Sequence, residues 1–414
     1  MNDVTISASF DSQYTFYQSD TRWIFSASVT GTYDAGPVVS GPSMYTGTEI
    51  ILDGKLVSAM KGISVSAEAT VINISKTGRI DAGDGVELLG ANQSVTNGGT
   101  IIATNFGIYY SSGSHIVNNG KILSDFIGIA GLSDDVKIEN NGLLKGHSGI
   151  YVGGNNVEIE LGIKSRIIGT GENPIGIWAE TSTEDFFKVE NAGLIQADII
   201  GGAGGSKITN TGNIIGTVRL NEGDDILDTS KGQIDGEIFG GSGNDTYVIS
   251  TAEILINELQ TEGADTIKSS VAISLESNIF NEQEIENLTL TGKAKINATG
   301  NELANVITGN KNNNIIKGGI GADTLNGGEG NDRLTGGGGH DNFVFKGGNE
   351  KDVITDFKDG DIVTISNWAG IDDYLDLLDH ALNVGKSVVI SSGNDSLTIE
   401  NLHKGNLNQN DFDI

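Results

Sequence analysis

Residues 300–344 divide into nines as GNELANVIT, GNKNNNIIK, GGIGADTLN, GGEGNDRLT and GGGGHDNFV. Every repeat has Gly first, Asn or Asp sixth, and Ile, Leu or Phe eighth. A Gly- and Asn-rich linker has no reason to keep an apolar residue at every eighth position, so this spacing predicts a folded repeat. The repeats begin at Gly300, Gly309, Gly318, Gly327 and Gly336, and Phe345 follows the last one.

Each repeat combines a tight turn with a short strand. Glycine at positions one, two and four permits the positive φ that such a turn requires. The strand that follows the turn points its apolar eighth-position side chain inward. Because two nonapeptides make one flattened coil, turns that lie eighteen residues apart are expected to stack. Asp323 is therefore expected over Asp341 on one edge of the coil, and Asn314 over Asp332 on the other.

Stacked turns of this composition predict calcium sites. Calcium takes six to eight oxygen ligands at about 2.3–2.6 Å, with carboxylates and carbonyls mixed. Two isolated copies of the pattern, NEGDDILD at Asn221 and GGSGNDTYV at Gly240, extend the prediction beyond the main array. The predicted ligand positions are Asp225, Asp245, Asn305, Asn314, Gly318, Gly319, Gly321, Asp323, Gly327, Gly328, Gly330, Asp332, Gly336, Gly337, Gly339 and Asp341.

The predicted sites differ in strength. Asn305 and Asn314 replace Asp in the first two repeats, and neutral amide oxygens bind calcium more weakly than carboxylates. The second repeat also lacks Gly at positions two and four. The strongest site is therefore expected between 318–323 and 336–341, with a weaker one over 309–330.

The charge of the chain favours cations as partners. The 55 acidic and 25 basic residues give a net charge of −30, which argues against nucleic acid and anionic membranes. With 60 Gly and 3 Pro among 414 residues, the composition suits many tight turns. Cys is absent, so neither disulfides nor a cysteine zinc site holds the fold. No apolar run approaches the roughly 18 residues that span a bilayer. The start, MNDVTISASF, lacks the basic and apolar regions of a signal peptide.

A second, looser repeat runs from about residue 71 to 218. VTNGGTI, IVNNGKI, IENNGLL, VENAGLI and ITNTGNI share the frame apolar, any, Asn, any, Gly, any, apolar, at a period near 22 residues. This period resembles a right-handed parallel β-helix with three strands per coil, although a left-handed or two-sheet solenoid also fits. The recurring Asn residues are interpreted as a structural hydrogen-bonded ladder inside the turns. They are Asn97, Asn118, Asn140, Asn191 and Asn210.

Aromatic residues recur within the same coils, in GIYY, GIYV and GIWA. Because side chains alternate along a strand, an inward Ile places the next residue in solvent. Tyr109, Tyr151 and Trp178 are therefore expected in one exposed column, which motivates a polysaccharide-binding hypothesis. Ordinary stacking of β-forming residues is the alternative interpretation.

Catalysis has weaker support. The chain has no HExxH zinc motif, and Gly146-His147-Ser148-Gly149-Ile150 is an incomplete nucleophile elbow. Acidic and His side chains near one coil edge are candidates for a lyase or epimerase, although random surface scatter explains them more simply. They are Asp81, Asp84, Asp125, His147 and Asp198.

The C-terminal half resembles a known family. The nonapeptides, DVITDFKDGDIVTI after them and the acidic–hydrophobic ending NQNDFDI are similar to secreted RTX proteins that type I systems export. The resemblance covers roughly residues 221–414 and implies an uncleaved C-terminal export signal. It also implies a partner in the secretion apparatus and placement outside a Gram-negative cell. It says nothing about residues 1–220.

We therefore expect an all-β chain: a right-handed parallel β-helix, then an RTX parallel β-roll with a C-terminal cap of strands and a helix near 371–382. The expected function is a secreted, calcium-binding β-solenoid that acts as a binding or adhesion module for polysaccharide. A polysaccharide lyase or epimerase and a surface-layer protein are the alternatives. The expected divisions are capping strands 1–70, β-helix 71–220, connecting strands 221–299, β-roll 300–345, and cap with export signal 346–414.

Overall fold

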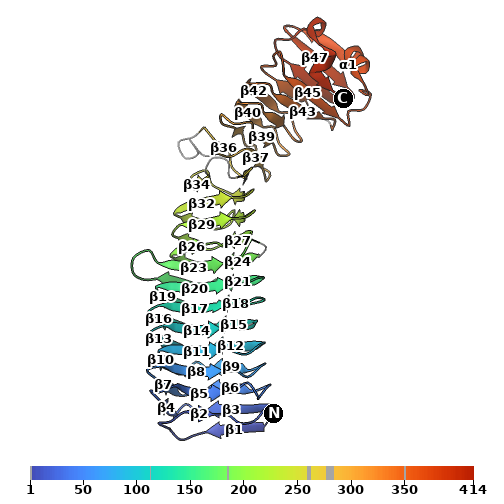
Figure 1. Ribbon diagram of the computed structural model, residues 1–414. Helices are drawn as coiled ribbons and strands as arrows, with labels where there is room; N and C mark the ends of the chain where they lie inside the picture. The colour runs from blue at the N-terminus through green and yellow to red at the C-terminus, as the bar shows by residue number, and fades with distance from the viewer. Residues whose placement is uncertain (1, 112, 184–185, 259–262, 277–283, 349–350) are drawn as a thin grey trace. The chain divides into compact units, whose positions relative to one another are not determined.

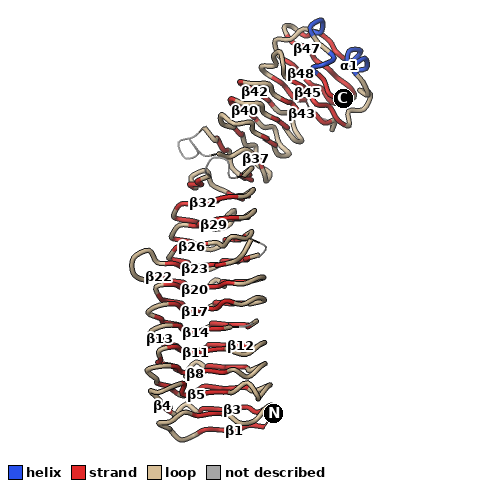
Figure 2. The backbone as a smooth tube through the Cα atoms, viewed as in Figure 1, coloured by secondary structure: helices blue, strands red, loops and turns tan. Residues whose placement is uncertain are grey.

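The chain is a parallel β-solenoid of about 17 turns with very little helix, seen here in a computed structural model (Figure 1). The structure describes residues 2–111, 113–183, 186–258, 263–276, 284–348 and 351–414. It divides into two compact units, residues 1–241 and 242–414. Short strands alternate with turns along both units (Figure 2), as expected from many glycines and few prolines. Among the helices of the described residues, none has the length and apolar character that crossing a membrane requires.

The first unit has three parallel sheets, A, B and C, and a full coil contributes one strand to each. Sheet A has β1 (Asn2–Ile6), β3 (Thr21–Phe25), β6 (Glu49–Leu52), β9 (Val71–Ile74), β12 (Gln93–Asn97), β15 (Ser114–Asn118), β18 (Lys137–Asn140), β21 (Val157–Leu161), β24 (Phe187–Asn191), β27 (Ser206–Asn210) and β30 (Ile226–Asp228). Sheet B has β4 (Thr30–Thr32), β7 (Lys55–Val57), β10 (Arg79–Ala82), β13 (Thr100–Ala103), β16 (Lys121–Ser124), β19 (Leu143–Gly146), β22 (Arg166–Gly169), β25 (Leu194–Gln196), β28 (Asn213–Ile215) and β31 (Gln233–Asp235). Sheet C has β2 (Tyr14–Thr15), β5 (Pro37–Gly41), β8 (Lys61–Val65), β11 (Asp84–Leu88), β14 (Phe106–Tyr110), β17 (Ile127–Leu132), β20 (Ser148–Gly153), β23 (Ile175–Glu180), β26 (Asp198–Ile200), β29 (Val218–Glu222) and β32 (Glu237–Ser242).

The three sheets exclude the two-sheet alternative for this unit. Strands of residues 1–70 belong to the same sheets as those of the β-helix: β3 pairs with β6, and β6 with β9. Inward-facing aliphatic residues such as Ile80, Ile101 and Ile122 stack in register and are fully buried. The core of this unit is therefore a set of aliphatic columns that run along the solenoid.

The asparagine ladder lies inside the turns between sheets A and B. Asn97 donates through Nδ2 to Oδ1 of Asn118 at 2.8 Å, and Asn118 donates to Asn140 at 2.7 Å. In the next coil Leu161 occupies the ladder position, and the Ser165 hydroxyl accepts from Asn140 instead. Buried amides require hydrogen-bond partners, and the ladder provides them, which confirms its structural interpretation.

The second unit replaces three sheets by two, because each nonapeptide contributes one strand and two repeats complete a coil. The first roll sheet has β33 (Thr246–Ile249), β35 (Thr266–Ser269), β37 (Asn287–Leu290), β39 (Val306–Thr308), β41 (Thr324–Asn326), β43 (Asn342–Lys346), β45 (Ile362–Ser366) and β49 (Phe412–Asp413). The second roll sheet has β36 (Ile273–Ser274), β38 (Ala298–Thr299), β40 (Ile315–Ile320), β42 (Arg333–Gly338), β44 (Lys351–Ile354), β48 (Asp395–Ile399), β47 (Ser387–Ser392) and β46 (Ala381–Val384). A short strand, β34 (Leu255–Asn257), lies between β33 and β35 in the chain.

The parallel stack ends in a cap. Helix α1 (Tyr374–His380) begins after Asp373, whose side chain accepts from the backbone N–H groups of Leu375 and Asp376. It lies within the segment expected to be helical and is shorter at both ends. The chain then turns into β46, β47 and β48, which pair antiparallel, and two 3₁₀ turns (Lys404–Asn406 and Gln409–Asp411) precede β49. A strand and helix cap thus closes the roll, as the sequence predicts.

Candidate calcium-binding turns

The glycines of the array have two different roles. At positions two and four they adopt positive φ, for example 123° at Gly319 and 125° at Gly321, as predicted. At position one the prediction of positive φ is wrong, and the requirement is steric instead. A Cβ on Gly318 would lie 2.2 Å from Oδ2 of Asp323, and one on Gly336 would lie 2.1 Å from Oδ2 of Asp341. Position one therefore lacks a side chain because the carboxylate of the same turn folds against it.

One column of side chains runs along the turns before the first roll sheet. The backbone N–H of Asn305 donates to Oδ1 of Asp323 at 2.8 Å, and that of Asp323 donates to Oδ1 of Asp341 at 3.1 Å. Asp341 in turn donates to Oδ1 of Asp361 at 2.9 Å. We call these four residues, Asn305, Asp323, Asp341 and Asp361, the first column. All four are almost completely buried.

A second column lies on the other edge of the coil. The backbone N–H of Asn314 donates to Oδ1 of Asp332 at 2.6 Å, and that of Asp332 donates to Oδ1 of Asp352 at 2.8 Å. The structure therefore stacks Asp323 on Asp341 and Asn314 on Asp332, as a coil of two nonapeptides predicts. In Asp323, Asp332 and Asp341 one carboxylate oxygen accepts from the backbone, which leaves the other oxygen for a different partner.

Two of those remaining oxygens are buried without a partner. Oδ2 of Asp323 and Oδ2 of Asp332 have no hydrogen-bond partner within the part of the chain that the structure describes. Burial, together with a smaller contribution from the neighbouring carboxyl, raises the pKa of Asp323 to about 6 and that of Asp332 to about 7. Burial also raises the pKa of Asp352 to about 6. A buried carboxylate without a cation is strongly unfavourable, so these oxygens fit the ligand set of a divalent metal.

The sequence did not single out Asp352 and Asp361 as ligand positions. Both follow the preceding member of their column after 20 residues instead of the 18 that separate Asp323 from Asp341. The two additional residues break the nine-residue frame, so a search for exact repeats misses them. The signal that was available in the sequence is an Asp directly before a β-branched residue, as in Asp352-Val353 and Asp361-Ile362.

The isolated repeats place their acidic residues in similar positions. Asp225, in the first unit, is fully buried and accepts from the backbone N–H of Ser206. Asp245, in the second unit, donates its N–H to Oδ1 of Asp265 at 2.8 Å. One ligand oxygen each of Asp245, Asp265 and Glu258 lies within 4.8 Å of the others. Asp265 and Glu258 were not singled out from the sequence, since neither belongs to a complete nonapeptide.

The aromatic residues of the β-helix lie on the outer face of sheet C. Strand register aligns Tyr109 with Ala130, Ala130 with Tyr151, and Tyr151 with Trp178. The rings of Tyr151 and Trp178 meet edge to face with centroids 5.1 Å apart. The Tyr151 hydroxyl donates to Glu180, and 39% of Trp178 is exposed. Tyr109 packs instead on Phe106, with ring centroids 5.5 Å apart.

The candidate catalytic residues do not converge. Asp81 and Asp125 line one shallow surface depression, but Asp81 is paired with Lys55 at 2.9 Å and with Arg79 at 2.8 Å. Elsewhere, His147 Nδ1 lies 3.3 Å from a backbone carbonyl, and Asp198 accepts from a backbone N–H at 2.8 Å. Among the described residues, these contacts bring no acid, base and aromatic side chain of the five candidates' surroundings together.

Comparison with known proteins identifies the repeats. The family model of the RTX calcium-binding nonapeptide repeat matches in four copies, at residues 237–248, 299–334, 308–343 and 318–351. No curated protein matches the chain. Among solved structures, the extracellular lipase LipA from Serratia marcescens overlaps it at 17% identity and a TM-score of 0.21. That overlap covers 55% of this chain and 42% of the lipase chain, less than half of its length. The chain therefore carries RTX calcium-binding repeats, and the second unit contains an RTX β-roll.

Proposed function

We propose that calcium binds between the stacked turns of the β-roll and that this binding folds the second unit outside the cell. The observation that carries the proposal is the pair of buried, unpartnered oxygens, Oδ2 of Asp323 and Oδ2 of Asp332. Carboxylates in both columns, together with carbonyls exposed by the positive-φ glycines, provide the mixed oxygen set that calcium prefers. Asn305 and Asn314 contribute amide oxygens in the weaker, earlier layers.

Calcium would decide between the unfolded and folded states of this unit. An ion that binds only the folded state stabilises it by about 2.7 kcal/mol per site at a hundredfold excess over Kd. Without the ion, burial of these carboxylates, and to a smaller extent repulsion by the neighbouring carboxyl, disfavours their charged form and raises the pKa of Asp323 and Asp332. Low calcium inside a cell would keep this unit unfolded and able to thread through a type I export apparatus. High calcium outside a Gram-negative cell would then fold it.

A calcium titration of the full chain tests this proposal. After treatment with chelator, far-ultraviolet circular dichroism should gain β-structure signal on addition of calcium, and magnesium at equal concentration should have little effect. Magnesium demands a smaller, octahedral site and keeps its waters, so it is a matched control ion. A spectrum that is already complete in chelator and indifferent to calcium would contradict the proposal.

For the first unit, we propose a polysaccharide-binding surface on sheet C. The observation that favours it is the pair of half-buried Tyr151 and exposed Trp178 beside the Glu180 carboxylate. Ala130 lies in register between Tyr109 and Tyr151, so the aromatic positions of these coils are not consecutive. Aromatic faces of this kind stack on sugar rings, and a nearby carboxylate accepts from sugar hydroxyls. The chain would then act as an extracellular binding or adhesion module.

A pull-down with soluble and insoluble polysaccharides separates binding from catalysis. The expected result is retention of the calcium-loaded chain, lost in a Tyr151→Ala, Trp178→Ala double variant and kept in Tyr17→Ala. Tyr17 is 67% exposed, which makes it a matched control for the loss of a surface aromatic. Release of unsaturated ends, followed by ultraviolet absorbance and abolished by Asp125→Asn, would instead identify a lyase. Calcium-dependent self-association without retention would identify a surface-layer role.

A further inference from the structure

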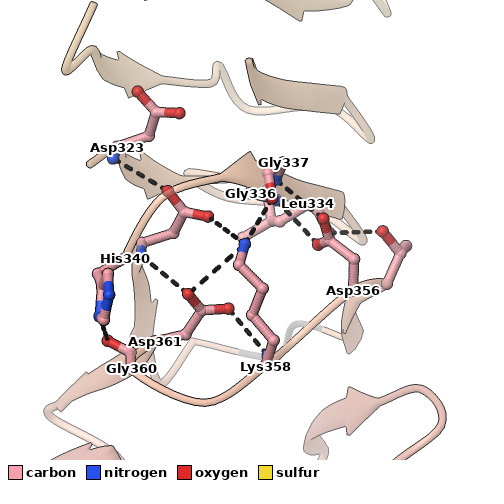
Figure 3. Close-up of polar contacts among 11 residues, drawn as sticks. Asp323, Leu334, Gly336, Gly337, His340, Asp356, Lys358, Gly360 and Asp361 are labelled. Carbon is pink, nitrogen blue, oxygen red and sulfur yellow. Dashed lines mark hydrogen bonds and ion pairs between the residues drawn. The ribbon is translucent and has the colours of Figure 1, made fainter. Parts of the chain in front are cut away.

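Lys358 reaches into the last layer of the first column. Its Nζ donates to the carbonyl oxygen of Gly337 and lies 3.3 Å from Oδ2 of Asp341 (Figure 3). The same ammonium is 3.9 Å from Oδ1 of Asp361. Three oxygens of two successive turns, a carbonyl and two carboxylates, therefore surround one positive charge. This is the kind of oxygen set that the repeats offer to calcium.

The turn that carries Lys358 is fixed on the turn before it. Oδ1 and Oδ2 of Asp356 accept from the backbone N–H groups of Gly336 at 2.9 Å and Gly337 at 2.8 Å. His340 Nδ1 lies 3.2 Å from the carbonyl oxygen of Gly360. The backbone N–H of Lys358 donates to Oδ2 of Asp361 at 3.0 Å. The loop over 356–361 therefore contacts the turn over 336–341 in two ways. The Asp356 carboxylate accepts from backbone N–H groups of that turn, and the Lys358 ammonium contacts its oxygens.

The layer before it differs in one respect. Asp323 and Asp341 occupy the same position of their repeats, have equivalent backbone hydrogen bonds, and are equally buried. Oδ2 of Asp341 contacts Lys358, whereas Oδ2 of Asp323 has no hydrogen-bond partner among the described residues. Oδ2 of Asp323 and Oδ2 of Asp341 occupy equivalent positions in successive coils of the column. The ammonium of Lys358 therefore lies where the repeat geometry would place a cation for Asp341.

We infer that Lys358 is a built-in substitute for calcium, which fills the last cation position of the first column and closes the layer between 336–341 and 356–361 without metal. The inference rests on the proposed calcium binding and adds which layers take the ion. Calcium enters the column only in the layers before Asp341. The end of the roll next to the C-terminal cap is then neutralised in chelator, and it provides a folded edge onto which the preceding coils assemble when calcium arrives.

Calcium stoichiometry of the full chain tests the substitution. Lys358→Met removes the ammonium and keeps most of the side-chain volume, so Gly337, Asp341 and Asp361 become available to metal. Isothermal titration should then find one more calcium ion per chain than in the wild type. Lys358→Arg, which retains the charge, and Lys346→Met, which removes an exposed lysine outside the column, should both keep the wild-type number. An unchanged number in Lys358→Met would overturn the inference.

A second variant covers the case in which Lys358→Met fails to fold. Asp361→Asn retains the acceptor for the backbone N–H of Asp341 but removes a carboxylate from the last layer. If Lys358 fills that layer, this variant keeps the wild-type calcium number, whereas Asp323→Asn loses an ion. Loss of an ion in Asp361→Asn would show that metal, and not lysine, closes the layer. A wild-type chain that binds no calcium would instead contradict the proposed function itself.

Discussion

At the scale of single residues, the β-roll depends on where carboxylates and glycines meet. Asp323 uses one oxygen to accept from the backbone N–H of Asn305 in the preceding turn of the column, and its second oxygen is buried without a partner among the described residues. Gly318 makes room for that carboxylate, and Gly319 and Gly321 adopt the positive φ that directs the turn. In the pattern GGxGxD, the glycines therefore provide the space and the backbone conformation that the buried Asp carboxylate requires.

Asp323→Asn should weaken calcium binding, whereas the same change of a carboxylate to an amide at an exposed position of the array should not. The amide retains the acceptor for the Asn305 backbone N–H but removes the charge that calcium requires. Titration calorimetry should show the loss of one ion or at least a tenfold weaker step, about 1.4 kcal/mol. The matched control is Glu302→Gln, an exposed carboxylate of the same array, which should change nothing measurable. Equal behaviour of the two variants would exclude Asp323 as a ligand.

Gly337→Ala should destabilise the second unit, whereas Gly338→Ala should not. Gly337 has φ of 99°, and a Cβ there would lie 2.1 Å from the carbonyl oxygen of Gly319. Strained backbone of this kind costs about 1–3 kcal/mol before the clash is counted. A Cβ on Gly338 meets nothing closer than 3.8 Å. Urea unfolding in calcium should separate the two variants, and similar midpoints would contradict the turn geometry.

At the scale of elements, each unit depends on a ladder that runs along its turns. In the first unit the ladder is neutral: Asn97, Asn118 and Asn140 donate amide to amide. In the second unit it is acidic, and each backbone N–H donates to the carboxylate of the next coil. The neutral ladder is complete by itself, whereas the acidic ladder concentrates negative charge in a buried position. The two units therefore differ in their need for a cation.

Replacing an inner Asn of the neutral ladder should destabilise the first unit with or without calcium. Asn118→Ala removes the ladder hydrogen bonds to the Asn97 amide and the Asn140 oxygen, each of which contributes about 0.5–1.5 kcal/mol. Asn119→Ala, at the exposed neighbouring position, should stay within about 0.5 kcal/mol of the wild type. Urea unfolding in chelator measures both. Equal losses would mean that the buried ladder contributes no more than the surface.

In chelator, the second unit should become more stable as the pH falls from 8 to 5. The pKa of Asp332 is raised to about 7 and those of Asp323 and Asp352 to about 6, so the folded state binds protons that the unfolded state still lacks. Stability then decreases as pH rises through that window. The β-structure signal in chelator, followed by circular dichroism, should therefore increase as the pH falls, and it should increase less in an Asp323→Asn, Asp332→Asn double variant. A signal in chelator that increases with pH would contradict the burial of uncompensated carboxylates.

At the scale of the whole molecule, the chain joins a β-helix with a neutral asparagine ladder to an RTX β-roll with acidic columns. The sequence predicted the two repeat periods, the parallel β-helix, the β-roll and the terminal helix, because each depends on local periodicity. It did not predict Asp352 and Asp361 as column members, because the 20-residue steps leave the nonapeptide frame. The role of Ser165 in the ladder and that of Lys358 in the column depend on contacts across coils, which no local pattern reveals.

Hydrogen–deuterium exchange of the full chain, in calcium and in chelator, tests the central claim most directly. The account predicts that backbone amides of the array, such as those of Asn314, Asp323 and Asp332, exchange rapidly in chelator and become protected when calcium is added. Amides of the neutral ladder in the first unit, such as those of Asn118 and Asn140, should be equally protected in both conditions. Equal protection of the array with and without calcium would contradict the claim that the metal orders this unit.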